Sequence, residues 1–348
     1  MKILVTGACG FAGSTIAAGL LAARERLTIT GLDNLSRPGS ELNRPILKKL
    51  GVKLLHLDIR SATDFEGLGK VDWVIDAAAN PSVLAGATGD VSSRQALEHN
   101  LLGTINLLEY CKSHGAGFIL LSTSRVYSVA ALSNLKMAVR NNAFRPVAQK
   151  VPGLTGKGIS EQFSTEPPLS LYGVAKRASE QLAIEYANLF NFPVYIDRCA
   201  VLAGAGQFGK ADQGIFSFWI HSYCWGKPLK YFGFKGNQVR DCLHPRDLVP
   251  VLLKQINGNR GPVTCNFGGG MKSAMSLRQL SDWCRERFRA HQVGNDPQRR
   301  PFDVPWLVLD PSVAASQWKW RPQTSVDAIL EEIARHAEKH PEWLEISR

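Results

Sequence analysis

The stretch KILVTGACGFAGSTIAAGLL, residues 2–21, decides the fold of this chain. A short apolar run leads into three glycines at three-residue spacing, Gly7, Gly10 and Gly13, and a helical pattern follows. Glycine lets the backbone approach a ligand closely, and the start of a helix presents N–H groups that attract a pyrophosphate. Tight strand–helix packing is the alternative use of such a turn. The position between a strand and a helix predicts a dinucleotide site.

The same alternation of strand and helix continues through the first two hundred residues. Helical patterns are clearest at 92–115 and 172–190. Nearly continuous apolar runs typical of buried parallel strands lie at 27–33, 52–58, 71–78, 117–123 and 192–199. This alternation predicts an α/β fold, a Rossmann-like doubly wound parallel sheet.

Acidic residues end two of the predicted strands. Asp33 lies twenty residues beyond Gly13, where a carboxylate accepts hydrogen bonds from ribose hydroxyls and repels a 2′-phosphate. This favours NAD over NADP. Arg37 could accommodate that phosphate, but we favour a solvated loop residue. Asp58 ends the third strand, where it faces the adenine or caps a turn.

The regular alternation fails at 128–168 and again from about residue 199, where the sequence becomes irregular and aromatic. A helix at 248–256 and a strand at 262–267 return to the first domain. We therefore expect an NAD-binding Rossmann domain of residues 1–198 with a return segment at about 238–266. A smaller α/β substrate domain comprises residues 199–237 and 267–348.

Composition narrows the possible partners. The 348-residue chain has a formal net charge of +11, but Lys and Arg are spread without a long basic stripe, which favours small anionic ligands over nucleic acid. Seven cysteines without C-x-x-C spacing, and histidines without ligand spacing, predict reduced thiols and no metal site. No apolar run is long enough to span a bilayer, so we expect a cytoplasmic protein with no membrane partner.

The segment SLYGVAK, residues 170–176, places Tyr172 and Lys176 on one helix face. Two ordinary surface residues are the alternative. Thr123, however, ends the fifth strand at the carboxyl edge, where doubly wound sheets bind ligands. A phenol with a pKa near 10 is a poor base, and a nearby ammonium and a cationic nicotinamide lower that pKa. The convergence predicts Thr123, Tyr172 and Lys176 as catalytic residues.

Five motifs together resemble the extended short-chain dehydrogenases/reductases, the NAD-dependent epimerase/dehydratase family, which act on nucleotide sugars. They are TGACGFAG (6–13), DNLSR (33–37), DIR (58–60), STSRVY (122–127) and YGVAK (172–176). The resemblance implies NAD, a nucleotide-sugar substrate and a homo-oligomer, dimer or tetramer. The implied cofactor-binding residues are Gly7, Gly10, Phe11, Ala12, Gly13, Asp33, Asn34, Asp58, Ile59, Ala77, Asn100, Tyr172 and Lys176.

Two motifs in the second half look like the CDP-paratose 2-epimerases, also called CDP-tyvelose epimerases: GQFGKADQGIF (206–216) and GNQVRDCLHPRDL (236–248). In the wider family the QVRD arginine contacts substrate phosphates, which points to Arg240. An ion pair of Arg240 with Asp241 or Asp247 is the alternative. The implied substrate-binding residues are Thr123, Ser124, Arg125, Gln207, Gln213, Arg240 and Arg299.

The pair after Thr123 separates reactions within the family. Similar dehydratases carry Asp-Glu there and related decarboxylases Ser-Glu, whereas this chain has Ser124 and Arg125 and so lacks the carboxylate. The resemblance therefore implies an epimerase. Two departures from the pattern, Ser128 and Asp76, remove no catalytic group. A 4-epimerase, dehydrogenase or reductase of another nucleotide sugar remains open, as does a non-catalytic dinucleotide-binding protein.

Overall fold

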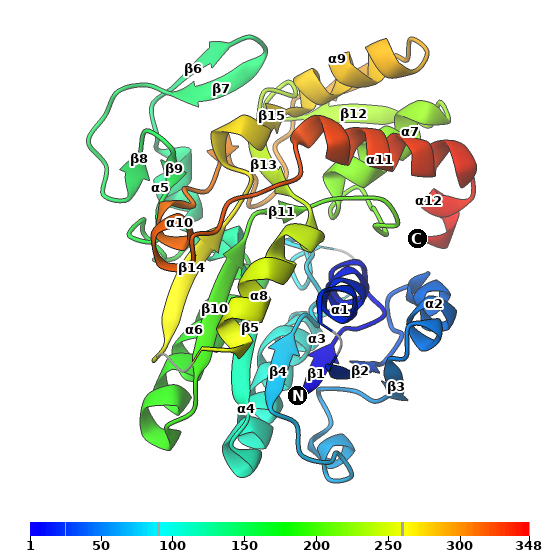
Figure 1. The fold of residues 1–348 in the computed structure, drawn as a ribbon. Helices are drawn as coiled ribbons and strands as arrows, with labels where there is room; N and C mark the ends of the chain where they lie inside the picture. Colours follow the sequence, from blue (N-terminus) through cyan, green and yellow to red (C-terminus); the bar gives the residue numbers. More distant parts are fainter. Residues whose placement is uncertain (25, 89–90, 259–260, 348) are drawn as a thin grey trace. The chain divides into compact units, whose positions relative to one another are not determined.

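The structure is a computed structural model that describes residues 1–24, 26–88, 91–258 and 261–347, and its chain divides into two compact units (Figure 1). Unit 1 comprises Met1–Thr123, Leu171–Arg198 and Pro245–Cys265. Unit 2 comprises Ser124–Ser170, Cys199–His244 and Asn266–Arg348.

A seven-stranded sheet forms the centre of unit 1, in the order β14-β10-β5-β4-β1-β2-β3. Its strands are β1 Lys2–Thr6, β2 Thr28–Asp33, β3 Lys53–His56, β4 Trp73–Asp76, β5 Gly117–Thr123, β10 Val194–Cys199 and β14 Val263–Phe267. The pairs β1–β2, β1–β4, β2–β3 and β4–β5 are parallel. The predicted Rossmann-like doubly wound sheet is confirmed, and the strand order reverses between β1 and β4, where such sheets bind ligands.

Two groups of helices accompany this sheet. Helices α1 Phe11–Ala23, α2 Asn43–Lys49 and α8 Val249–Ile256 form one group, in which α1 contacts both others. Helices α4 Gly103–His114 and α6 Leu171–Phe190 form the second group and contact each other and β5. Small residues on α6, Ala183 and Ala187, enter the same buried cluster as Leu107 and Leu108 of α4. Short 3₁₀ helices span Ser40–Leu42, Ala62–Phe65 and Pro245–Leu248.

The single helix expected at 92–115 is interrupted. It consists of α3 Ser93–Leu97, a π-helical turn at Glu98–Leu102, and α4. Within the turn, the Asn100 amide nitrogen donates to the carbonyls of Ala96 at 2.9 Å and Asn80 at 3.1 Å. The side chain thus competes for helix acceptors and ties the helix to the loop after β4, which is a physical cause for the local widening.

Unit 2 has a four-stranded sheet of β11 Val201–Leu202, β13 Val239–Leu243, β15 Ala274–Ser276 and β17 Trp306–Leu307, with a separate pair, β12 Leu229–Phe232 and β16 Val293–Asp296. Its helices are α7 Ile215–Cys224, α9 Leu277–Arg287, α10 Ser312–Trp318, α11 Val326–Lys339 and α12 Trp343–Ile346, with 3₁₀ turns at Ser124–Val126 and Gly270–Ser273. The aromatic stretch that looked irregular is α7 and β12. Phe216, Trp219, Ile220 and Tyr223 bury one side of α7 at three- and four-residue spacing.

Residues 128–168 contain α5 Val129–Ser133 and two hairpins, β6 Met137–Arg140 with β7 Ala143–Pro146 and β8 Leu154–Thr155 with β9 Gly158–Ile159. This segment shares a buried cluster with Trp306 and Leu307. Residues 124–170 therefore lie in unit 2, whereas the predicted boundary placed them in the Rossmann domain. Residues 238–244 were also predicted to belong to the Rossmann domain. They lie in unit 2 instead, because β13 pairs with β11, β15 and β17 of that unit.

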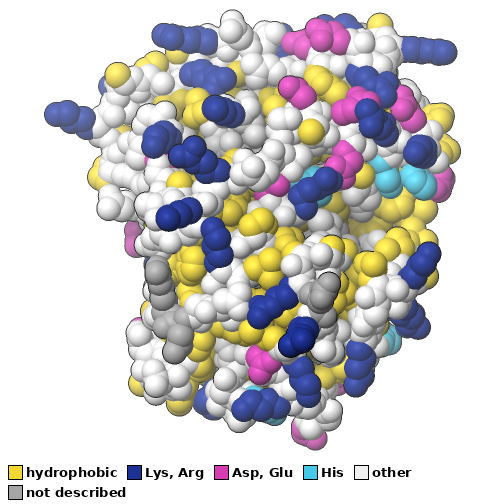
Figure 2. All heavy atoms as spheres, viewed as in Figure 1, with side chains coloured by type: hydrophobic (Ala, Val, Ile, Leu, Met, Phe, Trp, Pro, Cys, Tyr) yellow, Lys and Arg dark blue, Asp and Glu magenta, His cyan; other side chains and the backbone are white. Residues whose placement is uncertain are grey.

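On the face drawn in Figure 2, Lys and Arg side chains are scattered among hydrophobic and uncharged atoms. All seven cysteines are free thiols, six of them buried. Within the described ranges, no helix is both long and apolar enough to cross a membrane. The same residues contain no cluster of three or more His, Cys, Asp or Glu side chains placed to hold a metal ion.

Candidate functional site

The glycine-rich turn joins β1 to α1 at the carboxyl edge of the unit 1 sheet. Gly7 adopts a left-handed φ of 60°, and a Cβ there would lie 2.9 Å from the carbonyl oxygen of Ala77. A Cβ on Gly13 would lie 2.1 Å from the carbonyl oxygen of Gly7. Side chains at either position would therefore collide with backbone, and the turn can be this tight only with glycine.

The start of α1 fits an anionic group. Its N-cap is Gly10, which has no side chain to cap the helix, and the first turn has no acidic residue. Backbone N–H groups of Phe11, Ala12 and Gly13 lie in this first turn, at the positive end of the helix dipole. The residues present therefore fit the pyrophosphate of a dinucleotide at the predicted positions.

Asp33 ends β2 and is fixed by two backbone donors. The Cys9 N–H donates to Oδ2 and the Leu35 N–H to Oδ1, both at 2.8 Å. Burial, together with the negative charge of Asp33, raises the pKa of the Cys9 thiol to about 12. Asn43 of α2 donates to the Cys9 carbonyl at 2.8 Å, a contact that no sequence motif indicated. The carboxylate thus stands beside the glycine turn, as the ribose role requires, and Arg37 is half-buried rather than fully solvated.

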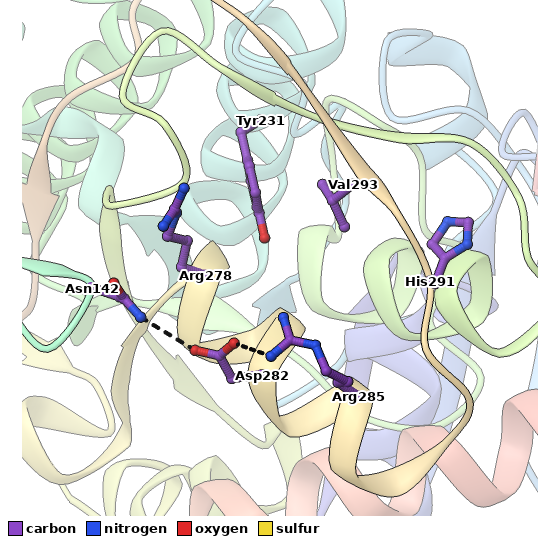
Figure 3. Close-up of a pocket in the computed structure, with 7 residues that line it drawn as sticks. All are labelled: Asn142, Tyr231, Arg278, Asp282, Arg285, His291 and Val293. Atoms are coloured by element: carbon purple, nitrogen blue, oxygen red, sulfur yellow. Dashed lines mark hydrogen bonds and ion pairs between the residues drawn. The ribbon is translucent and has the colours of Figure 1, made fainter.

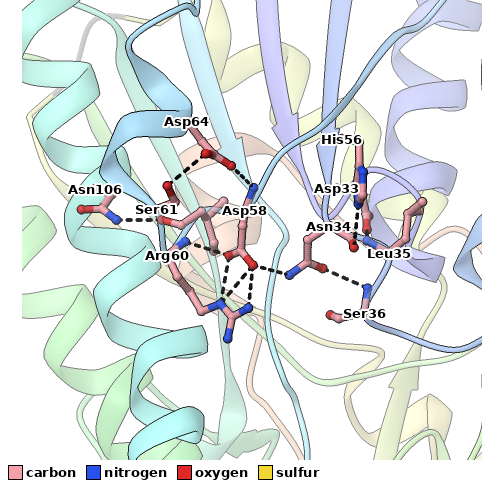
Figure 4. A network of polar contacts seen from close by, with 11 residues as sticks. Asp33, Asn34, Leu35, Ser36, His56, Asp58, Arg60, Ser61, Asp64 and Asn106 are labelled. Atoms are coloured by element: carbon pink, nitrogen blue, oxygen red, sulfur yellow. Dashed lines mark hydrogen bonds and ion pairs between the residues drawn. The ribbon is translucent and has the colours of Figure 1, made fainter.

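A polar network around Asp58 follows β3 (Figure 4). The Arg60 guanidinium binds the Asp58 carboxylate through two nitrogens, with Nη2 to Oδ2 at 2.6 Å, and Asn34 donates to Oδ2 at 3.0 Å. Hydrogen bonding from Arg60 is the main cause that holds the Asp58 pKa well below its usual range. Strand β3 ends at His56, two residues earlier than predicted. The Arg60 N–H also donates to Asp58 Oδ1 at 2.9 Å, so Asp58 fixes the turn after β3, and its place beside the adenine stays a prediction.

The loop after β4 is held from two sides. Buried Asp76 accepts hydrogen bonds from Thr6 at 2.8 Å and Thr104 at 3.1 Å, and the Ala78 N–H donates to the Thr6 hydroxyl at 3.2 Å. The Asn100 Oδ1 accepts the Asn80 N–H at 2.9 Å. Both amide hydrogens of Asn100 are also engaged within the protein. Asn100 and the unusual Asp76 therefore position the loop that carries Ala77 next to Gly7.

Ile59, another predicted cofactor residue, is 7% exposed and belongs to the buried cluster of unit 1. Its carbonyl accepts the Asn106 amide of α4 at 2.8 Å, so the loop after β3 is also anchored.

Three predicted catalytic residues lie in unit 1 on two packed elements. Thr123 ends β5, all seven residues of which are buried, and α6 contacts this strand. Tyr172 and Lys176 are 7% and 1% exposed and occupy the buried face of α6. They are therefore not ordinary surface residues, which removes the alternative suggested by their spacing alone.

The Lys176 ammonium has a property expected of a ligand-binding group. Among the described residues, none forms a hydrogen bond or ion pair with it, although the side chain is almost fully buried. A buried charge without a protein partner is costly. The Lys176 ammonium therefore fits a site that a bound polar group, such as a nicotinamide ribose, completes.

The predicted substrate residues beyond Thr123 all belong to unit 2. Ser124 is buried, and Arg125 donates to the Phe302 carbonyl at 3.4 Å. Exposed Arg299 lies over the Phe234 ring, 4.6 Å from its centroid. Ser124 and Arg125 are adjacent in the 3₁₀ turn at Ser124–Val126, whereas Arg299 lies in a distant stretch of the sequence.

Gln207 and Gln213 flank one loop of unit 2. Gln207 is 8% exposed and its amide nitrogen donates to the Leu202 carbonyl at 2.7 Å, whereas its buried Oε1 has no hydrogen-bond partner in the part of the chain that the structure describes. The Gln213 carbonyl accepts the Lys210 N–H at 2.7 Å, which closes the loop. The unpartnered oxygen makes Gln207 a candidate acceptor of a ligand hydrogen bond.

Arg240 is engaged within unit 2. Its Nη2 donates to Asp303 Oδ1 at 2.6 Å and to the Val304 carbonyl at 2.8 Å, and its Nη1 donates to the Val239 carbonyl at 2.7 Å. Burial lowers the pKa of Arg240, and the Asp303 charge opposes this most strongly. The partner is Asp303, not Asp241 or Asp247. Asp241 instead accepts backbone N–H groups of Gly270 and Leu309, and burial raises its pKa to about 7.

A small open pocket of about 200 Å³ lies elsewhere in unit 2 (Figure 3). It is lined by Asn142, Tyr231, Arg278, Asp282, Arg285, His291 and Val293. Asp282 accepts from Arg285 at 2.9 Å and from Asn142 at 3.4 Å, so its charge is balanced within the pocket. None of the predicted site residues lines it.

Comparison with known proteins gives matches over most of the chain. A model of the NAD dependent epimerase/dehydratase family matches residues 3–266. CDP-paratose 2-epimerase of Salmonella typhi is 28% identical over 93% of this chain and 96% of its own length. UDP-glucuronate 4-epimerase of Thermodesulfobacterium geofontis is 26% identical over 98% of this chain and 97% of its own.

Among solved structures, the NAD complex of Thermus thermophilus UDP-glucose 4-epimerase superposes with a TM-score of 0.76. It is 23% identical and the match covers 97% of this chain and 99% of that one. The similarity supports the fold of the whole chain.

Proposed function

Because the chain belongs to the NAD dependent epimerase/dehydratase family, we propose that it inverts C2 of a CDP-linked deoxyhexose of the paratose and tyvelose type. The predicted cofactor, NAD, and the predicted class of enzyme, the NAD-dependent sugar-nucleotide epimerases of the extended short-chain dehydrogenase/reductase type, are confirmed. The CDP-sugar and the C2 position are the proposal.

The proposed catalytic roles are supported by one observation: Thr123 ends β5, and Tyr172 and Lys176 lie on the buried face of α6. Tyr172 takes the proton of the sugar hydroxyl, and the Lys176 charge stabilises the phenolate. Thr123 holds the same hydroxyl in line for transfer. NAD bound at the β1–α1 glycine turn would supply the reversible hydride transfer.

Inversion requires that the keto sugar present its other face before its carbonyl carbon is reduced again and its oxygen takes the proton back from Tyr172. The residues after Thr123 support this outcome over elimination, because Ser124 and Arg125 supply no carboxylate to act as acid and base. The 28% identical CDP-paratose 2-epimerase supports the choice of sugar. Such an enzyme would supply a nucleotide sugar for polysaccharide biosynthesis in the cytoplasm.

A second candidate is a C4 epimerase of a UDP-sugar, supported by the 26% identical UDP-glucuronate 4-epimerase. The test incubates the purified protein separately with CDP-paratose, CDP-tyvelose, UDP-glucose and UDP-glucuronate, with proton NMR of the sugars and absorbance at 340 nm. The proposal predicts a C2 epimer of the CDP-sugar without net NADH. Conversion of the UDP-sugars alone at C4 would favour the second candidate, and stoichiometric NADH would show a dehydrogenase.

A further inference from the structure

One buried carboxylate of unit 1 has no place in the mechanism above. Glu180 follows Tyr172 and Lys176 at four-residue intervals on the same face of α6, and it is fully buried. An ionised carboxylate without solvent is costly unless it is paired and hydrogen-bonded. The contacts of Glu180 therefore need to be accounted for.

Those contacts join three elements. Arg198 of β10 binds Glu180 through a fork, with Nε to Oε1 at 2.9 Å and Nη2 to Oε2 at 2.6 Å. The Ser122 hydroxyl of β5 donates to Oε1 at 2.6 Å, and Arg177 lies 3.3 Å from Oε2. The Arg198 and Glu180 side chains are 6% and 1% exposed, so solvent barely screens the pair. Ser122 immediately precedes Thr123.

We infer that Glu180 is a positioning residue for the reaction: through Ser122 and Arg198 it fixes α6 along the sheet, and thereby Tyr172 relative to Thr123. The inference rests on the proposed roles of Thr123 and Tyr172. Apolar packing of similar volume would stabilise the fold as well as a buried ion pair does. The bidentate Arg198–Glu180 pair and the short Ser122–Glu180 hydrogen bond also fix the orientation of α6 and its register along β5. Apolar packing alone does not do this.

Two distances between the proposed catalytic residues are fixed in different ways. The spacing of Tyr172 and Lys176 is internal to α6 and is set by the helix itself. The spacing of Tyr172 and Thr123 joins two elements and depends on how α6 lies along β5. Glu180 is two turns from Tyr172, about 12 Å along the helix axis. Loss of the Glu180 contacts should therefore disturb alignment without changing the ionisation of Tyr172.

The experiment uses the full-length protein with the nucleotide sugar that the panel identifies. Ser122→Ala removes one hydrogen bond and leaves the ion pair in place, and Glu180→Gln removes the charge. We expect kcat to fall about tenfold or more in each, because small misplacement of reacting groups is costly, with KM within twofold. The pH dependence of kcat should keep its shape, because the Tyr172–Lys176 pair is unaltered.

Asp197→Asn is the matched control. Asp197 precedes Arg198 on β10, is equally buried, and accepts a hydrogen bond from Gln255 of α8 at 2.8 Å. This variant changes the same strand on its other side and away from Ser122 and Glu180, so kcat should stay within twofold of wild type whatever the change in Tm. Arg198→Lys keeps the charge without the fork and should give an intermediate kcat.

Wild-type kcat in both Ser122→Ala and Glu180→Gln, with only a lower Tm, would overturn the inference and leave Glu180 a structural residue. A shifted pH profile would also overturn it, since Glu180 would then act on ionisation instead of alignment. Should Glu180→Gln fail to fold, Ser122→Ala decides alone. Tyr172→Phe is measured alongside. If that variant is active, the proposed function fails, whereas an inactive Tyr172→Phe beside fully active Ser122→Ala and Glu180→Gln refutes only the positioning role.

Discussion

Asp303→Asn and Arg240→Met test whether Arg240 serves the fold or the substrate. A guanidinium can bind an anion in bidentate fashion through either of two pairs of nitrogens, and each pair includes Nη2. Both Nη2 hydrogens are engaged, by Asp303 at 2.6 Å and by the Val304 carbonyl at 2.8 Å. No complete fork remains for a diphosphate while these contacts hold. We therefore expect each substitution to lower stability and to leave substrate affinity within twofold.

The size of the effect follows from burial. The Arg240 and Asp303 side chains are 10% and 17% exposed, so the pair is largely desolvated. Breaking a fully buried pair costs about 3–5 kcal/mol. Asp303→Asn keeps a carbonyl acceptor for Nη2, so we expect about 2 kcal/mol. Arg240→Met loses three hydrogen bonds, so we expect about 3 kcal/mol. For a unit of this size 1 kcal/mol lowers Tm by about 2–4 °C.

Calorimetry measures both quantities. Scanning calorimetry of the wild type, the two single variants and the double variant gives a coupling energy, which should be about 2 kcal/mol, so the double variant is little less stable than Arg240→Met alone. Titration calorimetry with the nucleotide sugar gives Kd. Additive losses of stability together with a Kd weakened tenfold or more in Arg240→Met would refute this reasoning and support the predicted phosphate clamp.

Three further outcomes are expected. Tyr172→Phe should keep the fold and NAD binding and lose at least about a hundredfold in kcat, measured by NMR of the sugar, because a positioned acid–base group contributes on that scale; activity within a few-fold of wild type would remove Tyr172 from the mechanism. Asp33→Asn should narrow the preference for NAD over NADP in fluorescence titrations of the two cofactors, because the charge that repels a 2′-phosphate is lost; an unchanged ratio would assign the preference elsewhere. Burial lowers the pKa of His221 to about 3 and of His336 to about 4 from 6.5. As pH falls below 6.5 the unfolded chain therefore binds protons that the folded protein does not, and the free energy of unfolding declines toward pH 4. Urea titrations at pH 7.5 and 5 should show a smaller decline in His336→Asn, and an equal decline would exclude this origin.

Local patterns were enough to predict the sheet of unit 1, though not the bounds of the unit. The strand-then-glycine-then-helix order at residues 2–21 and the buried strand runs depend on contacts between neighbouring segments. The parallel sheet then brings strand ends to one edge without further information. For the same reason Gly7, Asp33 and Thr123 could be placed at that edge from the sequence alone, and Tyr172 with Lys176 on the buried face of α6.

Contacts between distant segments could not be predicted. Arg240 pairs with a residue 63 positions away, and nothing near residue 303 signals that pairing. The aromatic richness of 215–232 hid the helical spacing of α7, since no position of this helix is exposed and its buried positions include polar Ser217, His221 and Ser222. The position of Glu180 on the same helix face as Lys176 could be predicted, because it lies four residues further along a predicted helix. Its pairing with Arg198 could not, because no motif marks that strand residue.

The division of each unit into three separate stretches has a consequence for biosynthesis. The ribosome completes unit 1 only when Cys265 of the 348 residues has been made, because β14 lies at one end of its sheet. Until then β10 has an exposed edge, and segments destined for unit 2 have already been synthesised between the strands. The nascent chain thus cannot complete its first unit before segments of the second have been made, and exposed strand edges of this kind are where chaperones act and aggregation begins.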